Sequence, residues 1–234
     1  MIHMQTGIRS AISLLCLIVV TGLYCHAQPT PVTGETDYPF MIQLPSQEIL
    51  DNNPPILVFL HGRSLSGTNL NRVTRYGVLY AMAKGQQVPA IVIAPQSKGG
   101  WDPDKVMEVV DYTIEKYKAD SSRVYVAGMS MGGYGTMDVA GKYPDRVAAA
   151  VAICGGGTLS YAQNLTKVPL WIQHGNKDRI VPMSESKKIV NAIKKADPDA
   201  NVTLTIISGG NHGSVERLFH ADDIYDWMFK HVKE

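Results

Sequence analysis

The feature that most restricts the fold of this chain is an alternation of two kinds of segment. Short apolar runs rich in β-branched residues carry no polar alternation, as expected of strands buried on both faces of a parallel sheet. They lie at residues 56–60, 90–94, 123–127, 147–153, 170–173 and 202–207. Longer segments with helical spacing lie at residues 70–84, 103–117, 133–143, 184–195 and 215–230. This order predicts an α/β fold with a mostly parallel, doubly wound sheet flanked by helices, whose ligand site lies beyond the carboxyl ends of the strands.

Composition favours a single globular domain over residues 28–234. The 234 residues are 45% hydrophobic and 18% charged, which is enough apolar material for one sizeable core. The 22 basic and 21 acidic residues are interspersed, so no basic patch predicts nucleic acid as a partner. No insertion has the character of a large hydrophobic lid. The pattern makes no prediction of the oligomeric state.

The N-terminal segment predicts export to the periplasm or the extracellular space. Arg9 precedes an apolar stretch at residues 11–23, which is short for a membrane span but suits the core of a signal peptide. We interpret residues 1–27 as a signal peptide, with the mature chain starting at Gln28 and holding no stable membrane span. A buried or membrane-anchoring helix is the alternative. Lipid anchoring through Cys25 is a second one, disfavoured because the bulky Tyr24 precedes that cysteine.

The cysteines argue against disulfides in the mature chain. Cys16 and Cys25 fall within the predicted signal peptide, which leaves Cys154 without a partner. Cys154 ends an apolar run before three glycines, a position typical of a small buried residue rather than a catalytic thiol.

The sharpest chemical signal is a G-x-S-x-G motif at residues 128–132, placed between a predicted strand and a predicted helix. This context predicts a nucleophile elbow, in which Ser130 sits on a strained turn and the flanking glycines let strand and helix approach closely. A glycine-rich turn with an incidental serine is the alternative. A serine nucleophile requires a histidine base and an acid, which in this type of fold follow in the order acid, then histidine. Asp178 and His212 each follow a predicted strand in that order, and we predict them as the acid and the base.

Other histidines and aspartates fit these roles less well because of their positions in the chain. Histidines expected to have structural or surface roles are His61, His174, His220 and His231. Aspartates that precede the nucleophile or are typical of solvated helix ends are Asp102, Asp104, Asp197, Asp199, Asp222 and Asp223.

An oxyanion hole needs two backbone N–H groups aimed at the oxygen that becomes negative. One is predicted from Met131, the residue after the nucleophile, and the second from Arg63, in the loop that follows the strand at residues 56–60. Trp101 follows another strand and is predicted to line the substrate site, with a core position as the alternative.

Together, the segments LVFLHG, VIAPQ, RVYVAGMSMGGYGTM, LWIQHGNKDRIVP and GGNH resemble a group of short α/β-hydrolases. These are the phospholipase/carboxylesterase-like, poly(hydroxybutyrate)-depolymerase-like and feruloyl or acetylxylan esterase-like enzymes, with relatives described as peptidases. The likeness runs from about residue 56 to residue 227. It implies a serine esterase that needs no metal or cofactor, with Ser130, Asp178 and His212 at the triad positions. Many relatives have a glycine or another small residue soon after His-Gly, whereas this chain has Arg63 and Ser64. This departure leaves open which amide completes the oxyanion hole, and it predicts a cation on the acyl or leaving-group side.

The first functional hypothesis is therefore a secreted serine esterase acting on short acyl, acetyl or feruloyl esters of plant polysaccharide. The second is a peptidase of the prolyl-oligopeptidase-like type that uses the same triad. A pocket carboxylate that holds a substrate amino group would distinguish this peptidase. A binding module that keeps the fold without catalysis is the third hypothesis, and the intact set of serine, acid, histidine and glycines argues against it.

Overall fold

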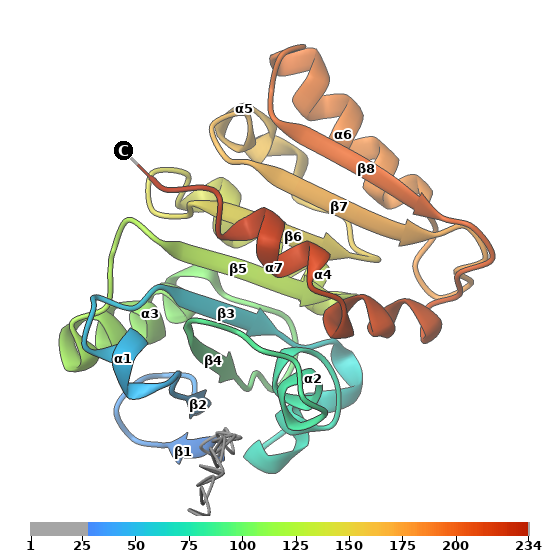
Figure 1. Cartoon of the computed structure of the whole chain (residues 1–234). Helices are drawn as coiled ribbons and strands as arrows, with labels where there is room; N and C mark the ends of the chain where they lie inside the picture. The colour runs from blue at the N-terminus through green and yellow to red at the C-terminus, as the bar shows by residue number, and fades with distance from the viewer. Residues whose placement is uncertain (1–27, 234) are drawn as a thin grey trace, which may run out of the picture.

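The computed structural model describes residues 28–233, so the predicted signal peptide lies outside the described residues. Within that range the chain forms an eight-stranded sheet with the order β1-β2-β4-β3-β5-β6-β7-β8 (Figure 1). The strands are β1 (Thr30–Val32), β2 (Phe40–Gln43), β3 (Ile56–Leu60), β4 (Ile91–Pro95), β5 (Val124–Met129), β6 (Ala149–Ile153), β7 (Leu170–Gly175) and β8 (Val202–Ile207).

The sheet is parallel from β4 to β8, and β1 and β2 add an antiparallel edge. The order of the strands reverses between β3 and β5, because the chain goes from β3 to β4 on one side and then returns to β5 on the other. Such a reversal opens a crevice beyond the carboxyl ends of the two strands, which is where open α/β sheets bind ligands. The predicted doubly wound fold class is confirmed.

Helices cover both faces of the sheet (Figure 1). The α-helices are α1 (Gln47–Leu50), α2 (Val78–Ala83), α3 (Pro103–Tyr117), α4 (Met131–Lys142), α5 (Ala162–Leu165), α6 (Ser184–Ala196) and α7 (Asp223–Met228). The 3-10 helices are η1 (Arg63–Leu65), η2 (Leu70–Thr74), η3 (Leu159–Tyr161) and η4 (Ser214–His220). Side chains of α3, α4 and α6 pack in the core on one face, and those of α2, η4 and α7 pack on the other.

Strand β3 shows how the sequence supplies both cores. Ile56, Val58 and Leu60 belong to the core under α3 and α4, whereas Leu57 and Phe59 belong to the opposite core. Successive side chains of a strand point to opposite faces, so an unbroken apolar run is what a strand covered on both faces requires.

Two helices predicted as continuous are each broken in the structure. The segment 70–84 divides into η2 and α2 around Gly77, whose φ is +79°. A Cβ at Gly77 would lie 1.9 Å from the ring of Phe59, so the bend depends on glycine there. The segment 215–230 divides into η4 and α7 because Ala221 is extended, with φ −108° and ψ 145°. Spacing alone did not reveal either break.

Strands β1 and β2 were not predicted. Both are short and lie at one edge of the sheet, and β1 contains Pro31, which an edge position tolerates. Among the described residues, no helix combines the length and apolar character needed to cross a bilayer. Residues 28–233 likewise contain no large inserted lid over the carboxyl ends of the strands.

Candidate active site

Ser130 occupies the sharp turn between β5 and α4. Its backbone has φ 60° and ψ −122°, a conformation that costs a non-glycine residue energy and occurs at functional turns. Glycine on either side makes the turn feasible. A Cβ at Gly128 would lie 2.4 Å from the carbonyl oxygen of Gly132, and one at Gly132 would lie 1.8 Å from that of Leu60. The motif therefore produces the elbow geometry expected of it.

His212 joins Ser130 to Asp178. Its Nε2 lies 2.9 Å from Ser130 Oγ, and its Nδ1 lies 2.7 Å from Asp178 Oδ2. The carboxylate can only accept a hydrogen bond, so Nδ1 donates to it and Nε2 is left to accept the serine proton. The structure thus brings together the three residues predicted as nucleophile, base and acid, from loops that follow β5, β7 and β8.

Asp178 is held as a carboxylate although its side chain is fully buried. Burial alone would raise the pKa of Asp178, but hydrogen bonds from His212 and from the amides of Val181 and Ile180 outweigh it and hold that pKa below its usual range. The two amides donate to Oδ1 at 2.9 Å and 2.8 Å. These bonds also fix the direction of the carboxylate, which keeps Oδ2 pointed at His212.

The two amides predicted for the oxyanion hole both occupy first helical positions. Met131 begins α4 and Arg63 begins η1, so neither N–H has an acceptor within its own helix. Gly62, directly before Arg63, packs against the nucleophile, since a Cβ there would lie 3.2 Å from Ser130 Cβ. The Gly62 N–H donates to the hydroxyl of Tyr76 at 2.7 Å, which anchors the loop that carries Arg63.

A cavity of about 510 Å³ opens beside Ser130 and His212. It is lined by Gly62, Arg63, Ser64, Arg75, Tyr76, Tyr80, Met129, Ser130, Ile180, His212, Gly213 and Glu216. The sequence did not point to Arg75, Tyr76, Tyr80 or Glu216, because they stand near the helix breaks that spacing missed. Glu216 Oε1, on η4, accepts a hydrogen bond from the Gly77 amide at 3.0 Å, which ties this carboxylate to the bend at Gly77.

Trp101 lies outside this cavity. Its Nε1 donates to the carbonyl oxygen of His61 at 3.1 Å, and its ring packs edge-on against Tyr38 and His61. A Cβ at Gly135 would collide with the indole at 2.6 Å. These contacts match the core position weighed as the alternative, with the indole supporting the loop after β3 from behind.

The remaining histidines take part in local contacts. His61 is fully buried, and burial lowers its pKa; its Nδ1 lies 2.8 Å from the Gly62 carbonyl and its Nε2 accepts the Ser97 amide. His220 lies 3.2 Å from Glu216 and edge-on to Tyr80. His174 is fully buried behind Asp178.

One group in the described part of the chain has side-chain atoms close enough to share a metal ion. Atoms of Cys154, His174 and Asp178 all lie within 4.8 Å of one another. Burial, then the neighbouring Asp178 carboxylate, raise the pKa of the Cys154 thiol to about 12, so it remains protonated. His174 Nε2 already faces the Val181 carbonyl at 3.0 Å. Since a metal ligand must offer a free lone pair, these donors fit a metal ion poorly.

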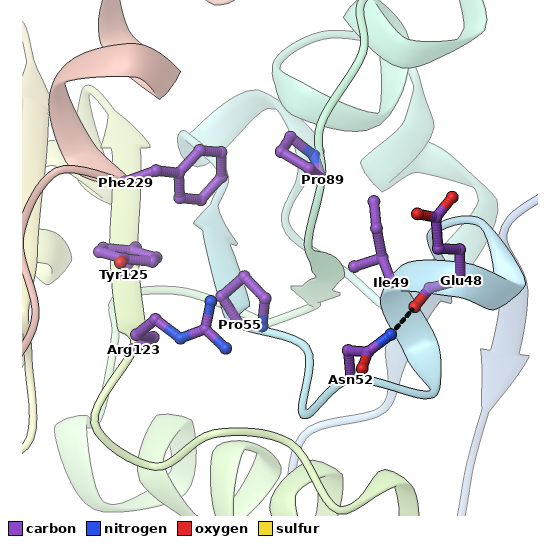
Figure 2. Close-up of a pocket in the computed structure, with 8 residues that line it drawn as sticks. All are labelled: Glu48, Ile49, Asn52, Pro55, Pro89, Arg123, Tyr125 and Phe229. Atoms are coloured by element: carbon purple, nitrogen blue, oxygen red, sulfur yellow. Dashed lines mark hydrogen bonds between the residues drawn. The ribbon is translucent and has the colours of Figure 1, made fainter.

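A second cavity, of about 370 Å³, lies at the opposite end of the sheet (Figure 2). Its lining includes Pro55 and Arg123, which directly precede β3 and β5, and none of the three triad residues. Two of its polar side chains already have partners: the Arg123 guanidinium donates to the Asp120 carboxylate at 2.7 Å, and the Asn52 amide donates to the Glu48 carbonyl at 2.7 Å. Ligand chemistry in open α/β sheets belongs to the carboxyl ends of the strands, so the cavity beside Ser130 is the candidate active site.

Comparison with known proteins finds relatives among esterases. The family model of the dienelactone hydrolase family matches residues 96–223. Feruloyl esterase B of Thermothelomyces thermophilus is 33% identical over 160 residues, which cover 61% of this chain and 54% of that protein. Acetylxylan esterase A of Aspergillus awamori is 26% identical over 195 residues, which cover 76% of this chain and 61% of that protein.

Among solved structures, a thermostable esterase superposes with a TM-score of 0.78 at 25% identity, over 88% of this chain and 63% of that one. The predicted resemblance to α/β-hydrolase esterases is confirmed. The chain spans little more than half the length of the two curated relatives.

Proposed function

The chain belongs to the dienelactone hydrolase family, and from this premise we propose that it hydrolyses carboxylic esters through an acyl-enzyme formed on Ser130. The observation that carries the proposal is the continuous hydrogen-bonded chain from Ser130 Oγ through His212 to Asp178, at 2.9 Å and 2.7 Å. These distances lie within the range over which a base can take a proton from a nucleophile.

In the proposed reaction, Ser130 Oγ attacks the ester carbonyl while His212 Nε2 takes its proton. His212 then returns that proton to the departing alcohol, which leaves the acyl group on Ser130. A water molecule, deprotonated by the same nitrogen, releases the acid and restores the serine. Asp178 keeps Nδ1 protonated and stabilises the imidazolium formed in each half of the reaction.

The oxyanion of each tetrahedral intermediate is bound by the Met131 and Arg63 amides in this proposal. The support is that both amides lack an acceptor within their helices and that the residue before Arg63 packs against Ser130. Removing one such donor in a hydrolase costs about 10²–10³-fold in kcat.

The proposed substrates are short acyl, acetyl or feruloyl esters of plant polysaccharide, without a metal or cofactor. The names of the feruloyl and acetylxylan esterase relatives support this class. The cavity of about 510 Å³ falls within the range typical of small-ligand sites, and its opening is free of a lid among the described residues. The tyrosines Tyr76 and Tyr80 give the cavity wall aromatic surface for an acyl group.

A peptidase that uses the same triad is the second candidate, because Glu216 supplies a carboxylate in the cavity of the kind that would hold a substrate amino group. Two observations favour the esterase. Glu216 Oε1 already accepts the Gly77 amide and lies 3.2 Å from His220 Nε2. The guanidinium-bearing Arg63 and Arg75 line the same cavity and oppose the binding of a cation there.

Export of the chain is part of the proposal and is supported by the apolar stretch at residues 11–23 and the small Ala27 before Gln28. Expression of the full chain in a bacterial host, followed by N-terminal sequencing of the protein outside the cytoplasm, tests it. A mature chain that starts at Gln28 is the expected result, and retention of residues 1–27 in a cytoplasmic product would refute it.

The proposed activity is tested with p-nitrophenyl acetate, methyl ferulate and an aminoacyl-p-nitroanilide, using the wild type and Ser130→Ala. We expect turnover of at least one ester and its loss in the variant. Anilide hydrolysis as the dominant activity would favour the peptidase. Ester hydrolysis that survives in Ser130→Ala would refute the mechanism.

A further inference from the structure

His174 is a buried titratable residue that the reaction described above does not use. It lies at the end of β7, and its side chain is fully buried. Its Nε2 lies 3.0 Å from the Val181 carbonyl oxygen and 3.5 Å from Asp178 Oδ2. Its Nδ1 lies 2.8 Å from the hydroxyl oxygen of Ser186, on α6. The catalytic acid is therefore placed between two histidines, His212 in front and His174 behind.

The hydrogen bonds around His174 determine where its protons are. Ser186 Oγ lies 2.6 Å from the carbonyl oxygen of Gly155, which can only accept, so the single hydroxyl proton goes to that carbonyl. Ser186 Oγ then has no proton for His174, and Nδ1 must donate to it. At the other side of the ring, Nε2 faces a carbonyl and a carboxylate oxygen, both of which are acceptors. Both ring nitrogens are therefore placed to donate a hydrogen bond.

We infer that His174 is a buried imidazolium that neutralises the charge of Asp178 and thereby sets the pH range in which His212 can act as a base. A buried charge is stable only when it is paired and hydrogen-bonded, and His174 meets both conditions through Asp178, Val181 and Ser186.

The other titratable and charged groups around His174 and Asp178 do not neutralise the charge of Asp178. From the loop after β6, Cys154 is a protonated thiol and adds no charge. On α6, the carboxylate of Glu185 is bound by Lys188 at 2.7 Å. Lys177 and Arg179 flank Asp178 in the chain and are exposed, so solvent screens them. Asp178 and His174 thus form the buried ion pair, with His212 as the partner that changes charge during the reaction.

Through the proposed triad, on which this step rests, the charge on His174 affects the protonation of His212. If Asp178 carried an unbalanced charge, it would stabilise the protonated form of His212, and the base would be lost at a higher pH. A cation behind Asp178 weakens that attraction and keeps His212 neutral, and ready to accept the Ser130 proton, at a lower pH. His174 is accordingly a positioning residue, which acts on the reaction only through Asp178.

The charge on His174 can be measured without any activity. Nitrogen-15 NMR of the histidine-labelled wild-type chain at neutral pH should show both ring nitrogens of His174 protonated. The signal is assigned by its disappearance in His174→Gln or, should that variant not fold, by its shift in Ser186→Ala. One unprotonated ring nitrogen would overturn the proposal. This result stands even if the chain hydrolyses no ester, so failure of the proposed function would be recognised separately.

The effect on catalysis is tested by the pH profile of kcat/KM for p-nitrophenyl acetate in His174→Gln. Glutamine keeps a side-chain donor but no charge, so the acid limb should move to higher pH by on the order of one unit, as for unit charges roughly 6 Å apart in a partly solvated protein. His231→Gln, the same change at the far end of the sheet, should leave the profile in place. A His174→Gln profile that coincides with the wild type would overturn the proposal.

Discussion

Replacement of Gly132 by alanine tests the physical reason for the elbow at Ser130. The added Cβ would lie 1.8 Å from the Leu60 carbonyl oxygen, 2.5 Å from the Leu60 carbonyl carbon and 2.9 Å from the His61 carbonyl oxygen. These atoms belong to the backbone at the end of β3 and of the residue that follows it. No side-chain rotation can therefore relieve the contact. Overpacking of this kind costs typically 1–3 kcal/mol, and here we expect about 3 kcal/mol.

Gly132 lies in the first turn of α4, and alanine stabilises a helix by about 1 kcal/mol relative to glycine. The expected net loss of stability is therefore roughly 2 kcal/mol, which corresponds to a fall in Tm of about 4–8 °C for a domain of this size. To relieve the contact, α4 must move away from β3 and take Ser130 with it. A displacement of about 1 Å at a reacting atom can cost on the order of 10²-fold in rate, so kcat/KM should fall by a comparable factor well below the Tm.

The assay compares thermal unfolding and p-nitrophenyl acetate hydrolysis of Gly132→Ala with those of Gly99→Ala. A Cβ at Gly99 has no atom within 4 Å, so this control should change stability by less than about 0.5 kcal/mol. If Gly132→Ala matched the control in both Tm and kcat/KM, the close approach of α4 to β3 would not be what shapes the elbow.

Three further predictions concern the acid and the buried thiol. Asp178→Asn should lower kcat by about 10⁴-fold, measured with the same ester, because the amide no longer fixes the His212 tautomer; a loss below tenfold would contradict the assigned role. The pKa of Asp178 is lowered by folding, so the unfolded chain binds more protons in acid and the stability contributed by Asp178 is full above about pH 4 and lost below it. Urea unfolding at about pH 7 and pH 3 should therefore show a smaller difference between wild type and Asp178→Asn in acid; an unchanged difference would argue against the shift. Cys154, with a pKa near 12 and no exposed surface, should react with iodoacetamide only after unfolding, as peptide mapping would reveal; rapid labelling of the native chain would contradict its burial.

The residues of the proposed triad could be predicted because their positions depend on the order of the strands. Ser130, Asp178 and His212 each follow a buried apolar run, and the carboxyl ends of parallel strands meet at one edge of the sheet. The local sequence was sufficient to predict the role of Ser130, because the close backbone contacts of such a turn require the glycines of the motif. Neither Asp178 nor His212 lies in a motif of its own, so both could be predicted only together with the fold.

The cavity wall was less accessible because it depends on contacts between distant segments. Helical spacing around Gly77 gives no sign that the chain bends there, yet the ring of Phe59 makes a side chain at that point impossible. Arg75, Tyr76 and Tyr80 reach the cavity as a result of that bend. Trp101 was predicted from its place after a strand, but its indole turns toward the His61 carbonyl.

The role inferred for His174 was likewise hidden from the sequence. A histidine before a glycine at the end of a strand is typical of a structural residue, and spacing does not show which side chains surround it. The Ser186 hydroxyl reaches His174 from another element and donates to the Gly155 carbonyl. Proton positions follow from such three-dimensional contacts and not from the order of residues.

The proposed triad and the cavity wall come from different segments of the chain. The proposed nucleophile, acid and base come from the turns that follow β5, β7 and β8, whereas one wall of the cavity comes from the stretch between β3 and α2, which includes Arg63, Arg75 and Tyr76. Arg63 supplies an amide of the proposed oxyanion hole and Tyr76 anchors its loop, so both must be kept. The rest of that stretch carries no core strand and can be exchanged without moving the proposed triad. Grafting the corresponding stretch from a relative, with Arg63 and Tyr76 retained, is therefore the most economical route to a new substrate preference.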